Sequence, residues 1–432
     1  MIKKLIVAIL IVGLVAIGIV AVSRNRAPQG KIVIEWYSEY SGSIPHHVDF
    51  EGVESVGDWG NYVAKMYEAQ NPGVDIVPLI AVYAGGGSEQ LSVRLAAGKV
   101  PTVYEGFSGR LFTYAPLFLP LPDPTAPFLP AALDSLAYAD KIIAYPIVYK
   151  GALPVINVTL VEKAGCKVPD VQWTTDEATE LAKCLADSGE GHLMAFWTQK
   201  QSGHNVQWGW FGGGANLFED GDYLHCTFNT DYAVEYLEWE YSLLEYLPAN
   251  PSQYDVLGWL DAFTIGKIAL GIEGFVSGVD AAYKDGTIKE PQEFISVNWP
   301  HLPSIKGNPL HREAERAVAI FASSVEGNDK LKEEAIKFAT WLTGPDPGFA
   351  YSYRGDPGAR EDTQKVSMSS EALKVQEEFG TWGPGFASGG FNQARTAWSE
   401  ETYKFWAGEQ SARQALDNLA KRYNEIQAEI WQ

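Results

Sequence analysis

Carboxylates and aromatic rings are the side chains of this chain best suited to chemistry or recognition. Its 432 residues include 54 Asp and Glu, 14 Trp, 21 Tyr and 19 Phe. The sequence contains no phosphate-binding P-loop, dinucleotide GxGxxG, zinc HExxH or nucleophile GxSxG motif. So many carboxylates prevent any one pair from being nominated as the acid and nucleophile of a glycosidase. Aromatic platforms beside planar polar groups suit the apolar C–H faces and hydroxyls of sugars. The composition therefore favours a binding site over a catalytic one.

The charge of the chain excludes one class of ligand. Its net charge is −21 at pH 7, and no basic cluster follows the first 30 residues. Because phosphate backbones are bound by Lys and Arg patches, nucleic acid is not an expected partner. No Cys/His spacing indicates a metal site, and His46 and His47 are interpreted as solvated loop residues. We expect no cofactor.

Three cysteines are too few for a disulfide framework. Cys166 is expected to follow one short helix and Cys184 to lie in the next, so the two could meet across the turn and leave Cys226 alone. The alternative is that all three are small buried apolar residues.

The elements that must position these groups alternate along the first hundred residues. Residues 31–37 predict a strand, and a helix capped by Asp58 follows, with Trp59, Val63 and Tyr67 on its apolar face. A strand is expected over 74–80, a helix over 89–97 and a short strand over 101–104. Strand–helix alternation of this kind is typical of a parallel, doubly wound sheet. The length of the chain favours two lobes or domains over one.

Several stretches resemble one family at its own spacing. They are AYP at 144–146, an aliphatic strand at 153–158, EKAG at 162–165 and WT at 173–174. NPGVDIVPL, LAAGKVPTVYEG and FTIGKIALGIEGF add further matches. Together they are similar to the extracellular solute-binding proteins of the maltose-binding type, which feed ABC transporters. Thr102, Val276 and the insertion at 40–56 depart from the family pattern.

The resemblance implies a two-lobed, type II periplasmic-binding-protein-like α/β fold. Each lobe is expected to be a mainly parallel sheet flanked by helices, with three hinge crossings between the lobes. Residues 1–30 would be a leader and linker. The N-terminal lobe would comprise residues 31–147 plus 270–343, and the C-terminal lobe residues 148–269 plus 344–432. The stretch at 263–275 would be the return crossing into the first lobe, and the helix at 334–343 would lie at the third.

The resemblance also implies the ligand-contacting positions, taken one at a time from the family's loops. Lys150 falls where relatives often place a carboxylate. The expected ligand-binding residues are Glu39, Tyr40, Tyr83, Glu105, Phe107, Arg110, Lys150, Trp197, His204, Trp208, Trp210, Trp382, Arg395 and Trp398; none is expected to be catalytic.

The function implied is carbohydrate binding between two closing lobes, on behalf of the permease of an ABC importer. Relatives also carry glycerol phosphates, polyamines and iron, so the family is a firmer expectation than the sugar. Two alternatives remain open: a membrane-anchored polysaccharide hydrolase or lyase, and a ligand sensor for a receptor kinase. We expect a monomer.

The N-terminal segment predicts attachment to a membrane. Residues 5–22 carry no charge and follow Lys3 and Lys4. Eighteen helical residues span about 27 Å, just enough for a bilayer core. The site for cleavage is poor and no lipid-accepting Cys follows, so a retained anchor is favoured over a cleaved signal peptide. Either interpretation places the rest of the chain outside the cytoplasm.

Overall fold

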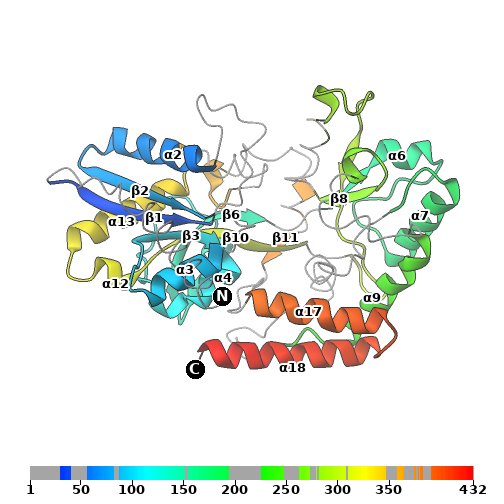
Figure 1. Cartoon of the computed structure of the whole chain (residues 1–432). Coiled ribbons are helices and arrows are strands. Elements are labelled where there is room, and N and C mark those ends of the chain that lie inside the picture. The colour runs from blue at the N-terminus through cyan, green and yellow to red at the C-terminus, as the bar shows by residue number, and fades with distance from the viewer. Residues whose placement is uncertain are drawn as a thin grey trace, which may run out of the picture.

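The structure is a computed structural model that describes the chain in segments. These are residues 30–39, 56–81, 87–150, 154–193, 225–247, 262–272, 282–307, 310–346, 358–363, 380–382 and 391–431, with positions 279, 374–375 and 378. Two lobes lie side by side in Figure 1, and the last two helices run along the bottom of the view. The expected two-lobed α/β fold is present.

The first lobe is built on a six-stranded sheet that begins with three parallel strands. Strand β1 (Ile32–Ser38) pairs with β2 (Val74–Ile80) over its whole length and with β3 (Val103–Phe107) at its carboxyl end. Helix α2 (Val56–Gln70) connects β1 to β2, and α3 (Gly87–Ala96) precedes β3. The five elements predicted from the sequence are present, and the bounds of β2 agree residue for residue. Helix α2 begins at Val56, however, so Asp58 lies inside the helix and is not its cap.

Helices cover both faces of this sheet. Successive side chains of a strand point to opposite faces, so neighbours in β1 enter different cores. Trp36 packs towards α2 and α13 (Asp329–Leu342), where its ring lies 5.7 Å from that of Phe338 in an edge arrangement. Tyr37 enters the other core with residues of α3, α4 (Ser108–Thr113) and α5 (Pro130–Asp134). The first lobe is therefore a three-layer α/β/α sandwich.

The remaining strands of the large sheet make it mixed. The long strand β10 (Leu310–Ile320) is antiparallel to β3 on one side and to β6 (Ala144–Lys150) on the other. Its first three residues pair in parallel with β11 (Gly380–Trp382). Figure 1 shows β6, β10 and β11 extending from the first lobe towards the second. β10 enters the sheet from the second lobe, so its direction is opposite to that of β3.

The second lobe contains a small sheet of a different kind. Strand β7 (Pro154–Asn157) lies between β8 (Leu270–Ile272) and β9 (Phe294–Ser296), and both pairings are antiparallel. A mainly parallel sheet was expected here, and the described part of this sheet contradicts that. Helices α6 (Val158–Lys163), α7 (Thr175–Ser188), α9 (Asp231–Ser242), α17 (Phe391–Trp406) and α18 (Ala412–Trp431) contribute to the same core.

Two expected boundaries differ from these pairings. Residues 270–302, assigned to the first lobe, supply β8 and β9 and bury Val297 and Trp299 in the core of the second. Residues 358–363, assigned to the second lobe, instead bridge to the first at Phe128 and Val148, and Ala359 packs in its core. The described residues of the expected return crossing, 263–272, include β8, which pairs with β7, and β10 is the strand that pairs with β3 and β6 in the large sheet. The helix expected at the third crossing is α13, inside the first lobe.

The described residues also include shorter elements. These are η2 (Ala115–Leu117), β4 (Ala137–Tyr138), β5 (Lys141–Ile142), η3 (Leu243–Tyr246) and α12 (Ala322–Val325).

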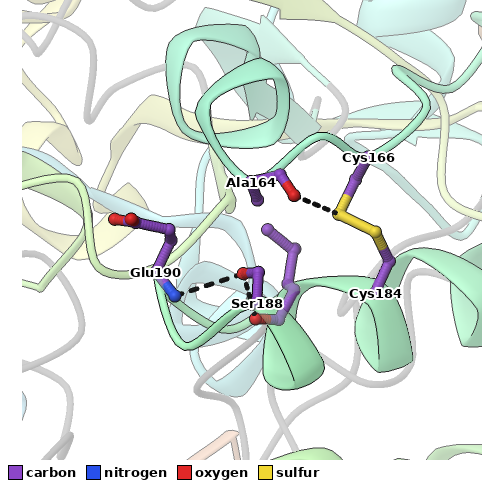
Figure 2. Close-up of a disulfide and its surroundings, with 6 residues drawn as sticks. Ala164, Cys166, Cys184, Ser188 and Glu190 are labelled. Carbon is purple, nitrogen blue, oxygen red and sulfur yellow. Dashed lines mark hydrogen bonds between the residues drawn. A yellow bond between two sulfur atoms is a disulfide. The ribbon is translucent and has the colours of Figure 1, made fainter.

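A disulfide ties α6 to α7, as the first interpretation of the cysteines predicts. Cys166, just beyond α6, is bonded to Cys184 within α7, with their Cα atoms 5.9 Å apart (Figure 2). Cys226 is half-buried and lies outside this disulfide. Helix α7 begins with a capping box, in which Thr174 and Glu177 each satisfy the other's backbone N–H. The helix end and the disulfide together fix the loop between the two helices.

Among the described helices, none is long and apolar enough to cross a membrane. The segment at 5–22 lies outside the described residues, as do His46, His47 and most of the insertion at 40–56.

Candidate ligand-binding site

The carboxyl ends of β1 and β3 form the place where this sheet would hold a ligand. The chain leaves β1 for β2 on one side and then returns to β3 on the other side of β1. Connections that diverge in this way open a crevice outside the strand ends, which is where open α/β sheets bind ligands. Ser38 and Glu105 are in register at these ends, and the Glu39 amide donates to the Glu105 carbonyl at 3.0 Å.

Four ionised side chains meet at this edge, and we call Glu39, Glu105, Arg110 and Arg316 the charge cluster. Arg110 Nη1 lies 2.6 Å from Glu39 Oε2, and Arg316 Nη1 lies 2.5 Å from Glu105 Oε1. Ser38 Oγ donates to the other oxygen of Glu105, and Arg316 Nη2 donates to the Glu39 carbonyl at 3.4 Å. All four side chains are at most 9% exposed.

The two pairs balance each other's charge. Burying an ionised group is costly unless it is paired and hydrogen-bonded, and each carboxylate here has its own guanidinium. Glu39 and Glu105 occupy strand positions of opposite parity, so one pair starts from each face of the sheet. The bond from Arg316 to the Glu39 carbonyl joins them around the sheet end. The result is a wall with donors and acceptors but no net charge.

Burial shifts the titration of the groups on the α3–α4 face. It raises the pKa of Glu39, and the Arg110 guanidinium offsets part of this by favouring the carboxylate. Burial, with the nearby Glu39 carboxylate, raises the pKa of Tyr104 well above its ordinary value. The phenol therefore stays protonated at neutral pH. Gly106 makes room for it: a Cβ there would lie 2.5 Å from the Tyr104 hydroxyl oxygen.

Phe107 is the aromatic member of this site. Its half-buried ring lies 4.5 Å from the Arg316 guanidinium carbon and 5.6 Å from that of Arg110, measured to the ring centroid. A guanidinium above a ring is attracted by its negative face, so the two arginines hold Phe107 while they bind the carboxylates.

Four of the residues expected to contact ligand are thus brought together: Glu39, Glu105, Phe107 and Arg110. Three more have only their backbone placed. Lys150 ends β6 opposite Glu313, Trp382 ends β11 opposite Arg312, and Arg395 lies in α17, a helix that contacts α4. The other expected residues lie outside the described part of the chain: Tyr40, Tyr83, Trp197, His204, Trp208 and Trp210.

Trp398 does not have the exposure of a stacking platform. It is 2% exposed in the core of the second lobe, with its ring centroid 5.4 Å from that of Phe228. Helix α17 is amphipathic, and Trp398 follows Ala394 and Ala397 on its buried face. We therefore reassign Trp398 from ligand contact to core packing.

The family model of the bacterial extracellular solute-binding proteins matches residues 53–348, more than half of the chain. The chain belongs to this family. A comparison with curated protein sequences finds no match. The family match confirms the resemblance found in the sequence and, with it, the expected two-lobed fold.

Solved structures of solute-binding proteins share the fold at low sequence identity. One is an ABC substrate-binding protein from Listeria monocytogenes in complex with cycloalternan, at 18% identity and a TM-score of 0.67, covering 91% of this chain and 98% of that one. The GacH receptor of Streptomyces glaucescens, solved with acarbose, is 15% identical with a TM-score of 0.69, covering 92% and 98%. A solute-binding protein from Thermotoga lettingae bound with α-D-tagatose is 19% identical with a TM-score of 0.69, covering 92% and 99%.

Arg316 is the member of this solute-binding protein's site that sequence reasoning missed. It directly precedes the apolar run AVAIF at 317–321 and follows the mixed-charge stretch HREAE at 311–315, so the sequence does not distinguish it from the other charged residues there. Its partner Glu105 is 211 positions away, so only the pairing of β10 with β3 brings them together.

A hollow of about 730 Å³ lies at the amino end of β3, whereas the charge cluster lies towards its carboxyl end. Its lining includes Val100, just before β3, and Phe321, just after β10, with Leu117 and Lys332 at its sides. The charge cluster does not contribute to it.

Proposed function

We propose that this solute-binding protein is the extracytoplasmic substrate-binding component of an ABC importer and that it binds a carbohydrate between its lobes. The observation that carries this is the charge-neutral cluster at the crevice edge. A wall whose carboxylates and guanidiniums are paired with one another offers hydrogen bonds without selecting a charged ligand. Cycloalternan, acarbose and tagatose, bound by the three structural relatives, are consistent with this chemistry.

The ligand contacts that we propose come from both lobes. Arg110 and Phe107 are the members of the site with some exposure, and they would meet the ligand directly. Glu39 and Glu105 would shape the wall behind them. From the second lobe, Trp208 and Trp210 remain the proposed stacking platforms.

Replacing a true platform by Ala is expected to cost on the order of 2 kcal/mol in affinity, as at other buried aromatic anchors. Titration calorimetry of Trp208→Ala and Trp210→Ala with maltotriose and mannotriose measures this. Folded variants that bind as tightly as the parent would remove the stacking assignment.

We place the lobe boundaries between β6 and β7 and ahead of β10, and we propose that the lobes close around the ligand. A ligand at 100 times its dissociation constant should stabilise the fold by about 2.7 kcal/mol. A thermal-shift screen of neutral oligosaccharides, with spermidine and glycerol 3-phosphate as charged comparisons, identifies the ligand class. Small-angle scattering then tests closure, because a tight ligand that leaves the radius of gyration unchanged contradicts it.

The hydrolase alternative makes a different prediction. A binding protein incubated with a polymer of its ligand releases no shorter product, whereas a hydrolase or lyase does. Chromatography of the incubation mixture decides between them. Loss of the polymer would replace the transport proposal with an enzymatic one.

We further propose that residues 5–22 remain as a membrane anchor, with residues 23–30 as a short polar linker. Lys3 and Lys4 favour a cytoplasmic N-terminus, although Arg24 and Arg26 weaken that preference. N-terminal sequencing of the protein from its native host tests this. A mature chain starting between positions 18 and 31 would mean that the segment is cleaved.

A further inference from the structure

Strand β10 links the site to the crossing between the lobes. The chain leaves the large sheet after β6, builds the small sheet, and returns with β10. The first residues of β10 pair with β11 and, at Glu313, with the last residue of β6. Its later residues, from Arg316 to Ile320, pair with β3 inside the first lobe. Arg316 is therefore the first residue of β10 that pairs with β3.

The pairing between β10 and β6 is irregular on both sides of Arg316. The register shifts between Glu313 and Arg316 and again between Arg316 and Ala317. Irregularities of this kind bend a strand and interrupt its ladder. The part of β10 that crosses towards the second lobe is thus separated from the part held by β3, and Arg316 stands at the junction.

The side chain of Arg316 attaches this junction to the ends of two other strands. It is fully buried, binds the Glu105 carboxylate at the end of β3 and donates to the Glu39 carbonyl at the end of β1. It also lies under the ring of Phe107. We propose that Arg316 is a positioning residue: it fixes the ligand-contacting ends of β1 and β3 to the strand that carries the crossing between lobes. The expected effect of Arg316 on ligand affinity rests on the proposed function, whereas its role in fixing the strand ends does not.

Arg316→Gln tests the proposal because it leaves Glu105 without its cation. Coupling between a binding site and a distant element typically changes affinity 5- to 150-fold, and we expect the variant to bind its sugar at least about tenfold more weakly. The affinity of Arg316→Lys should lie between those of Arg316→Gln and the parent. A lysine keeps one charged donor but lacks the two-pronged geometry of the guanidinium. The matched control is Arg94→Gln. Arg94, in α3, pairs with Glu35 of β1 at 3.1 Å but is about a quarter exposed and makes no ion pair with Glu39 or Glu105; the affinity of Arg94→Gln should change less than twofold.

A second readout needs no ligand. The Glu39 amide is held by the Glu105 carbonyl at 3.0 Å, so loosening these strand ends should speed its hydrogen exchange in Arg316→Gln relative to parent and to Arg94→Gln. If the parent binds no sugar among maltotriose, mannotriose and tagatose, the carbohydrate proposal fails while exchange at Glu39 still decides the role of Arg316.

A third variant covers the possibility that Arg316→Gln does not fold. Arg316→Gln combined with Glu105→Gln removes both charges and leaves two amides that can hydrogen-bond. This double variant should fold yet show the same weakened affinity and faster exchange. Parent-like affinity and exchange in any folded Arg316 variant would overturn the proposal and leave Arg316 a packing residue.

Discussion

Removing the disulfide should measurably destabilise the second lobe. Cys166 and Cys184 are 18 positions apart, and the chain-entropy model for a loop of this size gives about 3 kcal/mol of stabilisation at 25 °C. The same loop contains Trp173, which is buried and donates to the Asn298 carbonyl at 2.6 Å. The loop is thus ordered in the folded state, and the cross-link acts chiefly by restricting the unfolded chain.

The perturbation is the double variant Cys166→Ser/Cys184→Ser, measured by calorimetry beside the parent with and without reductant. For a unit of 150–250 residues, 1 kcal/mol corresponds to about 2–4 °C in Tm, so the expected decrease is about 6–12 °C. Cys226→Ser is the control, because that cysteine is half-buried and takes no part in the disulfide. It should change Tm far less.

Thiol counting gives an independent result. Denatured protein without reductant should present one free thiol per chain, and reduced protein three. Three free thiols in the unreduced parent would refute the disulfide. A double variant that melts with the parent would refute the stabilisation assigned to it.

Two further predictions concern local geometry. Gly106→Ala should cost about 1–3 kcal/mol by crowding the Tyr104 hydroxyl, whereas Gly73→Ala, with open space around its Cα, should cost less than 1 kcal/mol; urea denaturation compares them. Thr174→Ala should destabilise by about 0.5–2 kcal/mol through loss of the helix cap. The Thr174 backbone N–H, which an alanine would keep, donates to the Glu177 carboxylate and lowers its pKa, so the contribution of Glu177 is present above the unfolded pKa of about 4.3 and is lost as pH falls through the lower folded value. A Glu177→Gln penalty that is unchanged between pH 7 and pH 3 would contradict it.

The first lobe was predictable because its elements are long and regularly punctuated. The bounds of β2 follow from the Asn-Pro-Gly stop before it and the glycines after it, and β1 to β3 alternate with helices. Glu39, Glu105 and Arg110 were predicted from the loops of the family pattern, and the structure brings them together. Their pairing was not predictable, since ion-pair partners depend on which strands become neighbours.

The second lobe was less predictable for a physical reason. The described strands of its sheet are three or four residues long, too short for periodicity to reveal partner or direction. The stretch at 263–275 was therefore assigned to a crossing, although β8 pairs with β7. Trp398 was misassigned because an aromatic residue on an amphipathic helix looks the same in sequence whether its face meets a ligand or a core.

The position of the charge cluster explains how a lobe can be inserted without losing the site. The Glu105–Arg316 pair closes a loop that contains all three described strands of the second lobe's sheet, with a separation of 211 residues. Closing a loop costs about (3/2)RT ln n, so lengthening a ten-residue connection to ~160 residues between β6 and β10 adds only about 2.4 kcal/mol. Pairing of β10 with both β3 and β6 can offset a cost of that size. The site is complete only once β10 has returned, because β10 supplies Arg316. The strand that closes the long loop is thus the one that completes the charge cluster, and we expect structural changes at the crossing to alter the positions of Glu39 and Glu105.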